Sequence, residues 1–506
     1  MVSVVHSAGL HCLNGYIVQV EADISDGMPG MELVGFLGSE VKEARERVRM
    51  AIRNSEIAMP LRRITLNLSP AGIRKFGTGF DLPMAVAILK SMGAIPESST
   101  EKSVFFGELN LAGSLSAING VLPLVLCCAK AGFEKCYVPA DNAAEASAVN
   151  GMEVYPVDDL AQLIRHLRGD DPIENRTSGN AANTAADRDR YEHDLKYIQG
   201  QPFARRGLEI AAAGLHNIIM VGEPGAGKSM LSKCLPSILP PMTTEECMEV
   251  SSIYSVAGKL PKDHCLLAER PFVHPHHTVT DVALIGGGQY PTAGLAAQAH
   301  KGVLFLDEMP EFKREALECL RQPIEDGEIR IARNTGNFCY PADFMLVGAM
   351  NPCPCGAYPD RTRCSCTDTQ RRRYLDRLSK PLLDRIDLCI EVRNLQYEEL
   401  VGERKQEDSK TVRKRVEYAR RRQLERFCSP MFNARMNREQ IERYCALKPE
   451  GEKIMEQAFT KYHLSARGYY RILKVARTIA DLAGVDQILS EHLMEALHFR
   501  YTDLLK

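Results

Sequence analysis

Two short hydrophobic runs in the middle of the chain predict its central elements. Residues 218–221 (IIMV) and residues 303–306 (VLFL) contain no polar side chain, which is the pattern of strands buried on both faces. Polar residues begin directly after each run. Because parallel strands deliver their carboxyl ends to one edge of a sheet, we expect the two polar segments to lie side by side.

The segment after the first run, GEPGAGKSM, is a glycine-rich turn that leads into a predicted helix. Strand, turn and helix in this order predict a loop whose backbone N–H groups bind the phosphates of a nucleotide. Lys228 would supply a positive charge, and the Ser229 hydroxyl would be a ligand for Mg²⁺. The predicted nucleotide-binding residues are Gly222, Glu223, Pro224, Gly225, Ala226, Gly227, Lys228, Ser229 and Met230.

Two carboxylates, Asp307 and Glu308, follow the second run. Burying them without partners would be costly, so their place after a hydrophobic strand favours a functional role. We expect Asp307 to hold Mg²⁺ through water and Glu308 to orient an attacking water. Together the two segments predict hydrolysis of a nucleoside triphosphate.

A third hydrophobic run, residues 344–350, ends at Asn351. Its amide suits a position opposite the γ-phosphate, where it would hold the attacking water; the alternative is a turn-forming Asn before Pro. A hairpin is predicted before this run, with Arg330 and Arg333 near its tip. In a ring of subunits these two guanidinium groups would suit a phosphate backbone in the channel, and the alternative is a solvated hairpin.

The remaining pattern divides the chain into four parts. Residues 1–168 alternate strand-like and helical segments and predict an α/β domain. Residues 169–190 carry almost no aliphatic bulk and predict a flexible linker. Residues 191–395 hold the α/β core with the phosphate-binding loop, and residues 396–506 are predicted to be helices that form a lid.

Composition restricts the class of protein without changing this architecture. The chain has 506 residues, and its longest hydrophobic runs are far below the roughly 18 residues of a membrane span. Most of its 16 cysteines look like reduced core thiols, and the N-terminal residues lack an export signal. We therefore expect a cytoplasmic location and no membrane partner. With a net charge of −2, any contact with nucleic acid must come from local basic clusters.

Four cysteines depart from this dispersed pattern. Two Cys-x-Cys pairs, Cys353/Cys355 and Cys364/Cys366, flank a loop of eight residues. Four thiolates in one segment, residues 353–366, predict a structural Zn²⁺ site, although the spacing is tighter than usual. The alternatives are disulfide pairs or four idle thiols.

Two arginines are candidates for contacts with a triphosphate. In ring ATPases an Arg at the subunit edge stabilises charge on the neighbour's γ-phosphate, and Arg385 in PLLDRIDL suits that role. The alternative for Arg385 is an intrachain ion pair with Asp384 or Asp387. Arg467 begins a predicted lid helix, from which its charge would reach a nucleotide bound below the lid.

The order of elements in residues 1–168 resembles the Lon-type peptidase fold, which is ribosomal S5-like. Gly79 stands where that family has its catalytic Ser, and Leu122 stands where it has its Lys. Without a nucleophile or a base this domain cannot run that peptidase chemistry. We interpret it as a binding or assembly module.

Motifs along nearly the whole chain, the linker excepted, resemble the bacterial ComM/YifB proteins, which are magnesium-chelatase-like AAA+ ATPases. They are GEPGAGKSML, RPFVHPHHTVTDVALIGGG, GVLFLDEMPEF, AMNPCPCG, PLLDRIDL and LSARGYYRILKVARTIADL. The resemblance implies a homo-hexamer that uses ATP and Mg²⁺ for branch migration or helicase action on single-stranded and branched DNA. The setting that it implies is homologous recombination of incoming DNA in natural transformation (competence), alongside recombination proteins. By motif it assigns Lys228, Ser229, Asp307, Glu308 and Asn351 to the ATP site, Arg385 to the subunit interface and Arg467 to the lid.

A different class of function fits the same motifs. A metal-chelatase ATPase subunit, or a remodeller of a protein partner, would use the same ring without DNA contact. Stimulation of ATP hydrolysis by DNA, together with salt-sensitive DNA binding, would distinguish a DNA motor from these alternatives.

Overall fold

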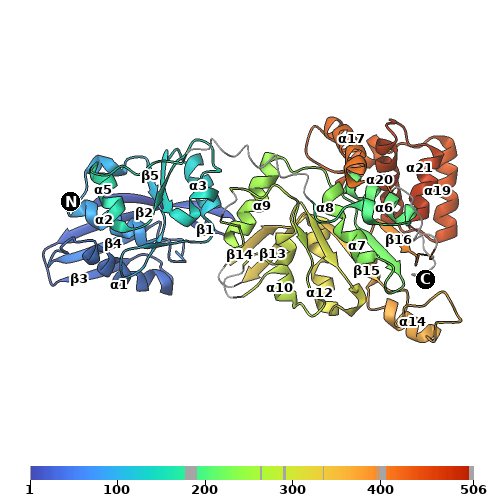
Figure 1. Cartoon of the computed structure of the whole chain (residues 1–506), viewed down its shortest axis with the longest axis horizontal. Coiled ribbons are helices and arrows are strands. Elements are labelled where there is room, and N and C mark those ends of the chain that lie inside the picture. Colours follow the sequence, from blue (N-terminus) through green and yellow to red (C-terminus); the bar gives the residue numbers. More distant parts are fainter. Residues whose placement is uncertain are drawn as a thin grey trace. The chain divides into compact units, whose positions relative to one another are not determined.

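The structure is a computed structural model that describes residues 2–176, 191–262, 265–288, 292–333, 336–395, 397 and 406–500 (Figure 1). Contacts divide the chain into two compact units. The first comprises Met1–Asp187 and Thr244–Ala268, and the second comprises Arg188–Thr243 and Glu269–Lys506. Most of the predicted linker, residues 177–190, lies outside the described residues. Within the described ranges, no helix combines the length and hydrophobicity needed to cross a membrane.

A seven-stranded mixed sheet organises the first unit, in the order β3-β4-β2-β1-β5-β8-β9. The β1 and β2 strands pair antiparallel, whereas β5, β8 and β9 pair in parallel. The strands are β1 (Ser3–His11), β2 (Asn14–Ser25), β3 (Gly30–Val34), β4 (Arg63–Ser69), β5 (Ser103–Phe105), β8 (Lys135–Pro139) and β9 (Glu153–Val157). The main helices are α1 (Ser39–Asn54), α2 (Asp81–Ser91), α3 (Val121–Lys130) and α5 (Leu160–Arg168). Helix α2 is almost entirely buried, which is why its sequence is hydrophobic on every face.

The helix α9 (Thr244–Val256) belongs to the first unit, although its sequence lies within residues 191–395. It packs against α3. The Ser255 carbonyl accepts a hydrogen bond from the Gly120 N–H (3.0 Å), and the Ser255 hydroxyl donates to Glu145 (2.6 Å). The chain therefore contributes to the first unit twice. Hydrophobic patterning does not reveal this excursion, because α9 has the same periodicity as a helix of the second unit.

Five parallel strands form the sheet of the second unit, in the order β11-β12-β15-β10-β16. They are β10 (Ile218–Gly222), β11 (Phe272–Val273), β12 (Val303–Leu306), β15 (Met345–Met350) and β16 (Leu388–Val392). The third hydrophobic run, β15, lies between the other two, with Val221 opposite Met350 and Leu306 opposite Gly348. The α/β class with a parallel sheet, predicted from these runs, is confirmed.

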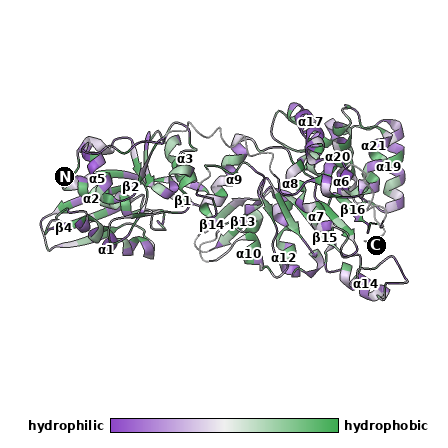
Figure 2. Ribbon diagram, in the orientation of Figure 1, coloured by the Kyte–Doolittle hydropathy of each residue, from purple (hydrophilic) through white to green (hydrophobic). Residues whose placement is uncertain are grey.

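Helices of the C-terminal region complete the second unit. They are α17 (Ser409–Phe427), α18 (Arg438–Tyr444), α19 (Pro449–Tyr462), α20 (Ala466–Leu482) and α21 (Ser490–Arg500). Helices α17 and α20 pack against α6 (Pro202–Gly214), so the helices and the sheet share one hydrophobic core. In Figure 2 the sheet is coloured mostly as hydrophobic, whereas α17 is coloured mostly as hydrophilic. A hairpin of β13 (Glu328–Arg333) and β14 (Gly336–Pro341) forms at the predicted place; its turn residues 334–335 lie outside the described part.

Candidate nucleotide site and cysteine cluster

Three neighbouring strands of the second unit end at one edge of the sheet and bring the predicted nucleotide-binding residues together. The glycine-rich loop follows β10, Asp307 and Glu308 follow β12, and Asn351 follows β15. Helix α7 (Lys228–Lys233) begins at the end of the loop, after Gly227 with a φ of 90°. A positive φ of this size is strained for other residue types, so glycine is needed for this turn into the helix.

Lys228 links the loop to Asn351. Its ammonium group donates hydrogen bonds to the carbonyls of Gly222 (2.7 Å) and Glu223 (2.8 Å) and to Oδ1 of Asn351 (3.1 Å). Burial lowers the pKa of Lys228, and Asp307 and Glu308 partly oppose this shift. The arrangement holds a positive charge between the loop and the amide, where it suits an anionic phosphate.

Ser229 and Asp307 form the pair expected at a Mg²⁺ position. The Ser229 hydroxyl donates to Oδ2 of Asp307 over 2.7 Å. A hydroxyl and a carboxylate in contact are oxygen ligands that suit Mg²⁺, directly or through water. Their residue types and spacing therefore fit the ion that the sequence predicts.

Glu308 is held in an unusual backbone conformation. Its φ is 50°, which is uncommon for a long side chain and marks a position fixed by its surroundings. Its N–H donates to Oδ1 of Asp307 (3.0 Å), while its carboxylate is 61% exposed. The exposed carboxylate is free to meet water beside the nucleotide loop.

His277 lies next to this carboxylate, with 3.7 Å between its Nδ1 and Oε2 of Glu308. It comes from the histidine-rich segment after β11, which reaches the same sheet edge because β11 runs parallel to β12. The sequence gives adjacent histidines in a Pro-broken loop but no sign that one faces Glu308. The ring of nearby His274 packs on Phe305 at a tilt of 43°, with ring centroids 4.8 Å apart, and burial lowers the pKa of His274.

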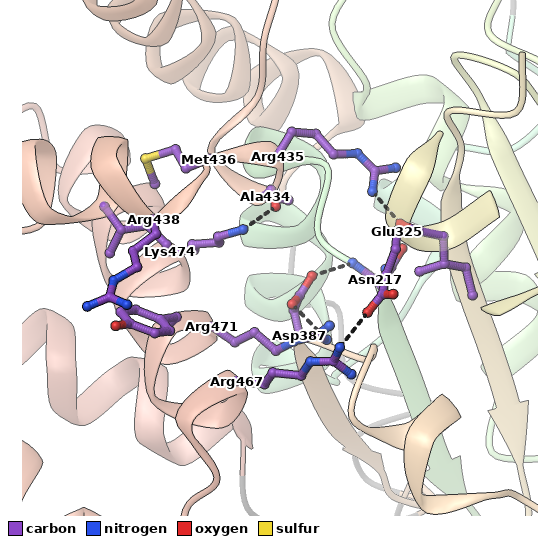
Figure 3. A pocket seen from close by; sticks show the side chains of 13 residues that line it. Asn217, Glu325, Asp387, Ala434, Arg435, Met436, Arg438, Arg467, Arg471 and Lys474 are labelled. Carbon is purple, nitrogen blue, oxygen red and sulfur yellow. Dashed lines mark hydrogen bonds and ion pairs between the residues drawn. The ribbon is translucent and has the colours of Figure 1, made fainter. Parts of the chain in front are cut away.

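The opposite edge of the sheet carries a second polar site, a cavity of about 320 Å³. Asn217, directly before β10, and Asp387, directly before β16, lie in its wall. Glu325 and Asp387 are its carboxylates, and the cations that line it are Arg435, Arg438, Arg467, Arg471 and Lys474. Figure 3 shows these side chains converging from the helices and the sheet. We call this group the basic cavity.

Arg467 lines the basic cavity rather than the nucleotide loop of its own chain. Its Nη2 lies 3.5 Å from Oε1 of Glu325, and its side chain is 60% exposed (Figure 3). The sheet separates the two sites, because the five steps along the strand from Asn217 to Gly222 span roughly 16 Å. Arg467 therefore does not point toward the nucleotide loop of its own chain, as its place in the lid had led us to expect.

Arg385 is buried beside the same cavity. Its guanidinium donates to the carbonyls of Arg321 (3.1 Å) and Pro381 (2.7 Å), and its Nη2 lies 2.6 Å from Oε2 of Glu325. The intrachain ion pair weighed as an alternative is thus present, but its partner is Glu325. Sequence distance hides this contact, because Glu325 comes from α13 (Arg321–Asp326), 60 positions away along the chain.

The two hairpin arginines are both exposed on β13. Arg330 is engaged with Glu328 of the same strand, with 2.6 Å between its Nε and Oε1. Arg333 stands at the last described residue before the turn. The positions leave both the DNA contact and the solvated hairpin open.

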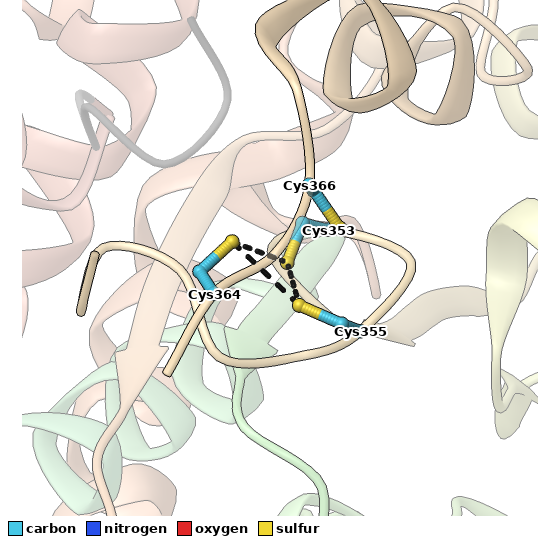
Figure 4. A group of neighbouring side chains, drawn as sticks. All are labelled: Cys353, Cys355, Cys364 and Cys366. Carbon is cyan, nitrogen blue, oxygen red and sulfur yellow. Dashed lines mark hydrogen bonds between the residues drawn. The ribbon is translucent and has the colours of Figure 1, made fainter. Parts of the chain in front are cut away.

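The four cysteines of residues 353–366 gather in one group (Figure 4). All four Sγ atoms lie within 4.8 Å of one another, and all are free thiols. In the part of the chain that the structure describes, no other set of three or more His, Cys, Asp or Glu comes together in this way, so the histidine-rich segment does not form such a group. In the first unit, Leu122 is fully buried in α3 and Gly79 precedes α2.

Comparisons with known proteins cover almost the whole chain. A family model described as magnesium chelatase, subunit ChlI, matches residues 194–400; a second, subunit ChlI of Mg-chelatase, matches residues 20–142; and its C-terminal counterpart matches residues 406–500. The chain is 41% identical to the competence protein ComM of Haemophilus influenzae, over 98% of this chain and 97% of the relative. It is 39% identical to the protein YifB of Salmonella typhimurium, over 99% of this chain and 98% of the relative. A magnesium-chelatase 67 kDa subunit of Chlorobaculum tepidum is 28% identical over 31% of this chain and 23% of the relative.

Proposed function

Because the chain belongs to the family of magnesium-chelatase-like AAA+ ATPases that includes ComM and YifB, we propose that it is an ATP-driven motor on DNA. In this proposal a homo-hexamer moves single-stranded or branched DNA and promotes branch migration or helicase action. It works in the cytoplasm, with recombination proteins, while incoming DNA is integrated in natural transformation. The Haemophilus relative is named a competence protein, which supports that setting.

The observation that carries the proposal is the convergence of five polar residues at one sheet edge. Lys228 neutralises phosphate charge, and the Ser229–Asp307 pair holds Mg²⁺. Bound there, Mg²⁺ supplies further neutralisation of the triphosphate. Glu308 accepts a proton from the attacking water, while Asn351, in contact with Lys228, orients that water. These roles give ATP hydrolysis without a covalent intermediate.

The basic cavity supports a ring in which neighbouring copies share each ATP site. Five cations line it against two carboxylates, so it suits an anionic group that its own nucleotide loop cannot present. In the proposal, Arg467 and Arg385 act on the γ-phosphate bound to the next subunit, and Arg385 changes its partner from Glu325 to that phosphate. Burial lowers the pKa of Lys474 to about 8, and this group lies deeper in the same wall.

The DNA contact is assigned to the exposed hairpin arginines, Arg330 and Arg333. If ATP binding and hydrolysis move the tip of the hairpin, its arginines would pull on the phosphate backbone of DNA without recognising the base sequence. The N-terminal α/β domain acts as an assembly or binding module. A further ion, Zn²⁺, belongs in this proposal to the four-cysteine cluster and not to the nucleotide pocket.

Turnover of ATP by the purified full chain, with and without forked DNA, tests the proposal. We expect hydrolysis that requires Mg²⁺ and rises severalfold with DNA, and DNA binding that weakens steeply as salt increases. Lys228→Ala serves as the control for contaminating ATPases. Turnover that ignores every DNA offered would contradict the motor.

A second candidate function is an ATPase subunit that acts on a protein partner, as a chelatase-type or remodelling complex. The partial match to the magnesium-chelatase 67 kDa subunit favours it. It predicts that ATP hydrolysis rises with a protein partner and is unchanged by DNA.

A further inference from the structure

The cysteine cluster has the geometry of a tetrahedral metal site. The Sγ atom of Cys353 lies 3.4 Å from that of Cys355 and 3.8 Å from that of Cys364, and Cys355 and Cys364 are 3.6 Å apart. Metal–sulfur bonds of about 2.3 Å in a tetrahedron place sulfur atoms about 3.8 Å apart. The thiols are therefore already spaced as ligands of one ion, with Cys366 completing the set.

The donor set argues against the ions that prefer oxygen ligands. Four sulfur atoms and no oxygen or nitrogen atom make up the group. Thiolates favour Zn²⁺ over Mg²⁺ and Ca²⁺, which prefer oxygen ligands. Four protein ligands also leave no open position, which is the mark of a structural rather than a catalytic zinc site.

The loop that carries the cysteines buries few hydrophobic side chains. Residues 351–367 contain neither helix nor strand, and most side chains from Pro354 to Cys366 are exposed or half-buried. Between Pro354 and Cys366 the buried hydrophobic side chain is Ala357, and the next along the chain is Tyr374 in α14 (Asp368–Leu375). A segment with so few buried hydrophobic groups needs a cross-link to keep one conformation.

This loop lies against the nucleotide pocket. Gly356 has a φ of 82°, and a Cβ atom there would lie 2.4 Å from Cδ of Pro224 in the glycine-rich loop. Arg363 contacts Glu223 of the same loop, with 3.2 Å between Nη1 and Oε2. Cys353 comes two residues after Asn351. The loop thus touches one wall of the pocket and continues from another.

We propose that Cys353, Cys355, Cys364 and Cys366 bind one structural Zn²⁺, and that the closed loop braces Pro224, Glu223 and Asn351 for ATP hydrolysis. The four thiols release four protons to solvent as they become ligands, and no electron is transferred. The metal site stands by itself; the brace rests on the proposed ATPase function.

Metal content of the full chain, purified in reductant without a histidine tag, tests the site. We expect about one zinc per chain by elemental analysis, and a tetrahedral thiolate spectrum when Co²⁺ replaces it. Cys364→Ser should lose the metal. Cys428→Ser is the matched control, because Cys428 is an exposed thiol remote in sequence from the cluster, and it should keep one zinc.

The measurement on the unaltered protein guards against a variant that fails to fold. Absence of zinc from the wild-type chain, or intact disulfides among these four cysteines in the native protein, would overturn the site. Equal zinc in Cys364→Ser and wild type would also overturn it.

The brace is tested with Gly356→Ala, which keeps all four thiols but pushes the loop away from Pro224. We expect one zinc per chain and ATP turnover reduced about tenfold, which corresponds to about 1.4 kcal/mol. Full turnover with zinc retained would refute the brace and leave the metal site standing. If the wild-type chain contains zinc but never hydrolyses ATP, the proposed function fails instead.

Discussion

The two edges of the parallel sheet in the second unit carry polar sites that are built in opposite ways. At the carboxyl edge, Asp307, Glu308 and Asn351 directly follow their strands, and Lys228 and Ser229 follow β10 after the glycine-rich loop. At the amino edge, the basic cavity combines side chains from the sheet, from α13 and from the helices after residue 433. The residues of the carboxyl edge can therefore be located from short stretches of sequence, whereas those of the amino edge depend on how distant helices pack.

The difference also suggests a division of labour in a ring. The carboxyl edge holds the residues proposed to bind a triphosphate and to activate water, and the amino edge holds surplus positive charge but no glycine-rich loop. Each edge would complete the other only between two copies of the chain. Four substitutions test this difference between the two edges.

The largest effect is expected at the carboxyl edge, from Glu308→Gln. The amide keeps the shape of the side chain but cannot accept the proton of the attacking water. We expect turnover to fall by about 10²–10⁴-fold with ATP affinity retained, measured by steady-state kinetics and nucleotide binding. Glu311→Gln is the control, because Glu311 pairs with Arg377 instead of facing the loop. Wild-type turnover in Glu308→Gln would remove Glu308 from the mechanism.

At the amino edge, Arg467→Ala should lower turnover about 10- to 100-fold, as expected for the loss of a charge-assisted hydrogen bond. Mixing the Arg467→Ala protein with the Lys228→Ala protein separates a role of Arg467 in the neighbouring subunit from a role in its own chain. A site between the two variants has an intact loop from one and an intact Arg467 from the other.

Random mixing should therefore restore up to about a quarter of the sites if the residue acts across the interface. Arg443→Ala, which alters an exposed arginine over Tyr444 outside the cavity, is the matched control and should stay active alone. A mixture as inactive as its two components would return Arg467 to a role within its own chain.

Sequence reasoning identified the carboxyl edge because its information is contiguous. A hydrophobic run followed by a polar residue is sufficient to place Asp307 and Asn351, and a run followed by a glycine-rich turn places Lys228. Parallel pairing of the strands then brings the three residues to one edge. The four cysteines were also recognisable, since two pairs stand close together in the sequence. The family resemblance is confirmed by relatives of about 40% identity along the whole chain.

The amino edge was not recognisable for the opposite reason. The partner of Arg385 is 60 positions away, and the direction in which Arg467 points depends on how α20 packs on α6. The sequence does not predict that α9 belongs to the first unit, for the same reason. The periodicity of a helix shows which face is buried but not which surface covers that face.

A third change compares the edges by stability. Asp343 lies before β15 at the amino edge, and although burial alone would raise its pKa, Arg435 and Lys301 lower it to about 2 from the ordinary 3.8. A carboxylate with a depressed pKa stabilises the fold above its unfolded pKa and loses this contribution as pH falls to the folded one. Asp343→Asn should therefore cost about 2 kcal/mol of unfolding free energy at pH 7.

Denaturant unfolding of wild type and Asp343→Asn would show the difference shrinking between pH 4 and pH 2, the interval given by the two pKa values. Asp326→Asn, a change at an exposed carboxylate, should leave stability nearly unchanged across the same range. A cost for Asp343→Asn that does not vary with pH would mean that the charge of Asp343 is not what stabilises the strand.

The smallest effect is expected from His277→Ala, which tests a contact at the carboxyl edge that the sequence did not indicate. His277 lies 3.7 Å from the Glu308 carboxylate and touches neither the loop nor Asn351 in any described contact. Its loss should leave the base less well oriented, so kcat should fall about tenfold or less while KM for ATP stays constant. His277→Asn retains a donor and should recover part of kcat. His276→Ala separates the carboxylate contact from the packing of the histidine segment. The His276 ring hydrogen-bonds to Thr278 and packs on His277, with ring centroids 4.1 Å apart, but it contacts Glu308 in no described interaction. An equal loss in His276→Ala, or a rise in KM without a fall in kcat, would show that the histidine segment supports the fold of the pocket and does not position Glu308.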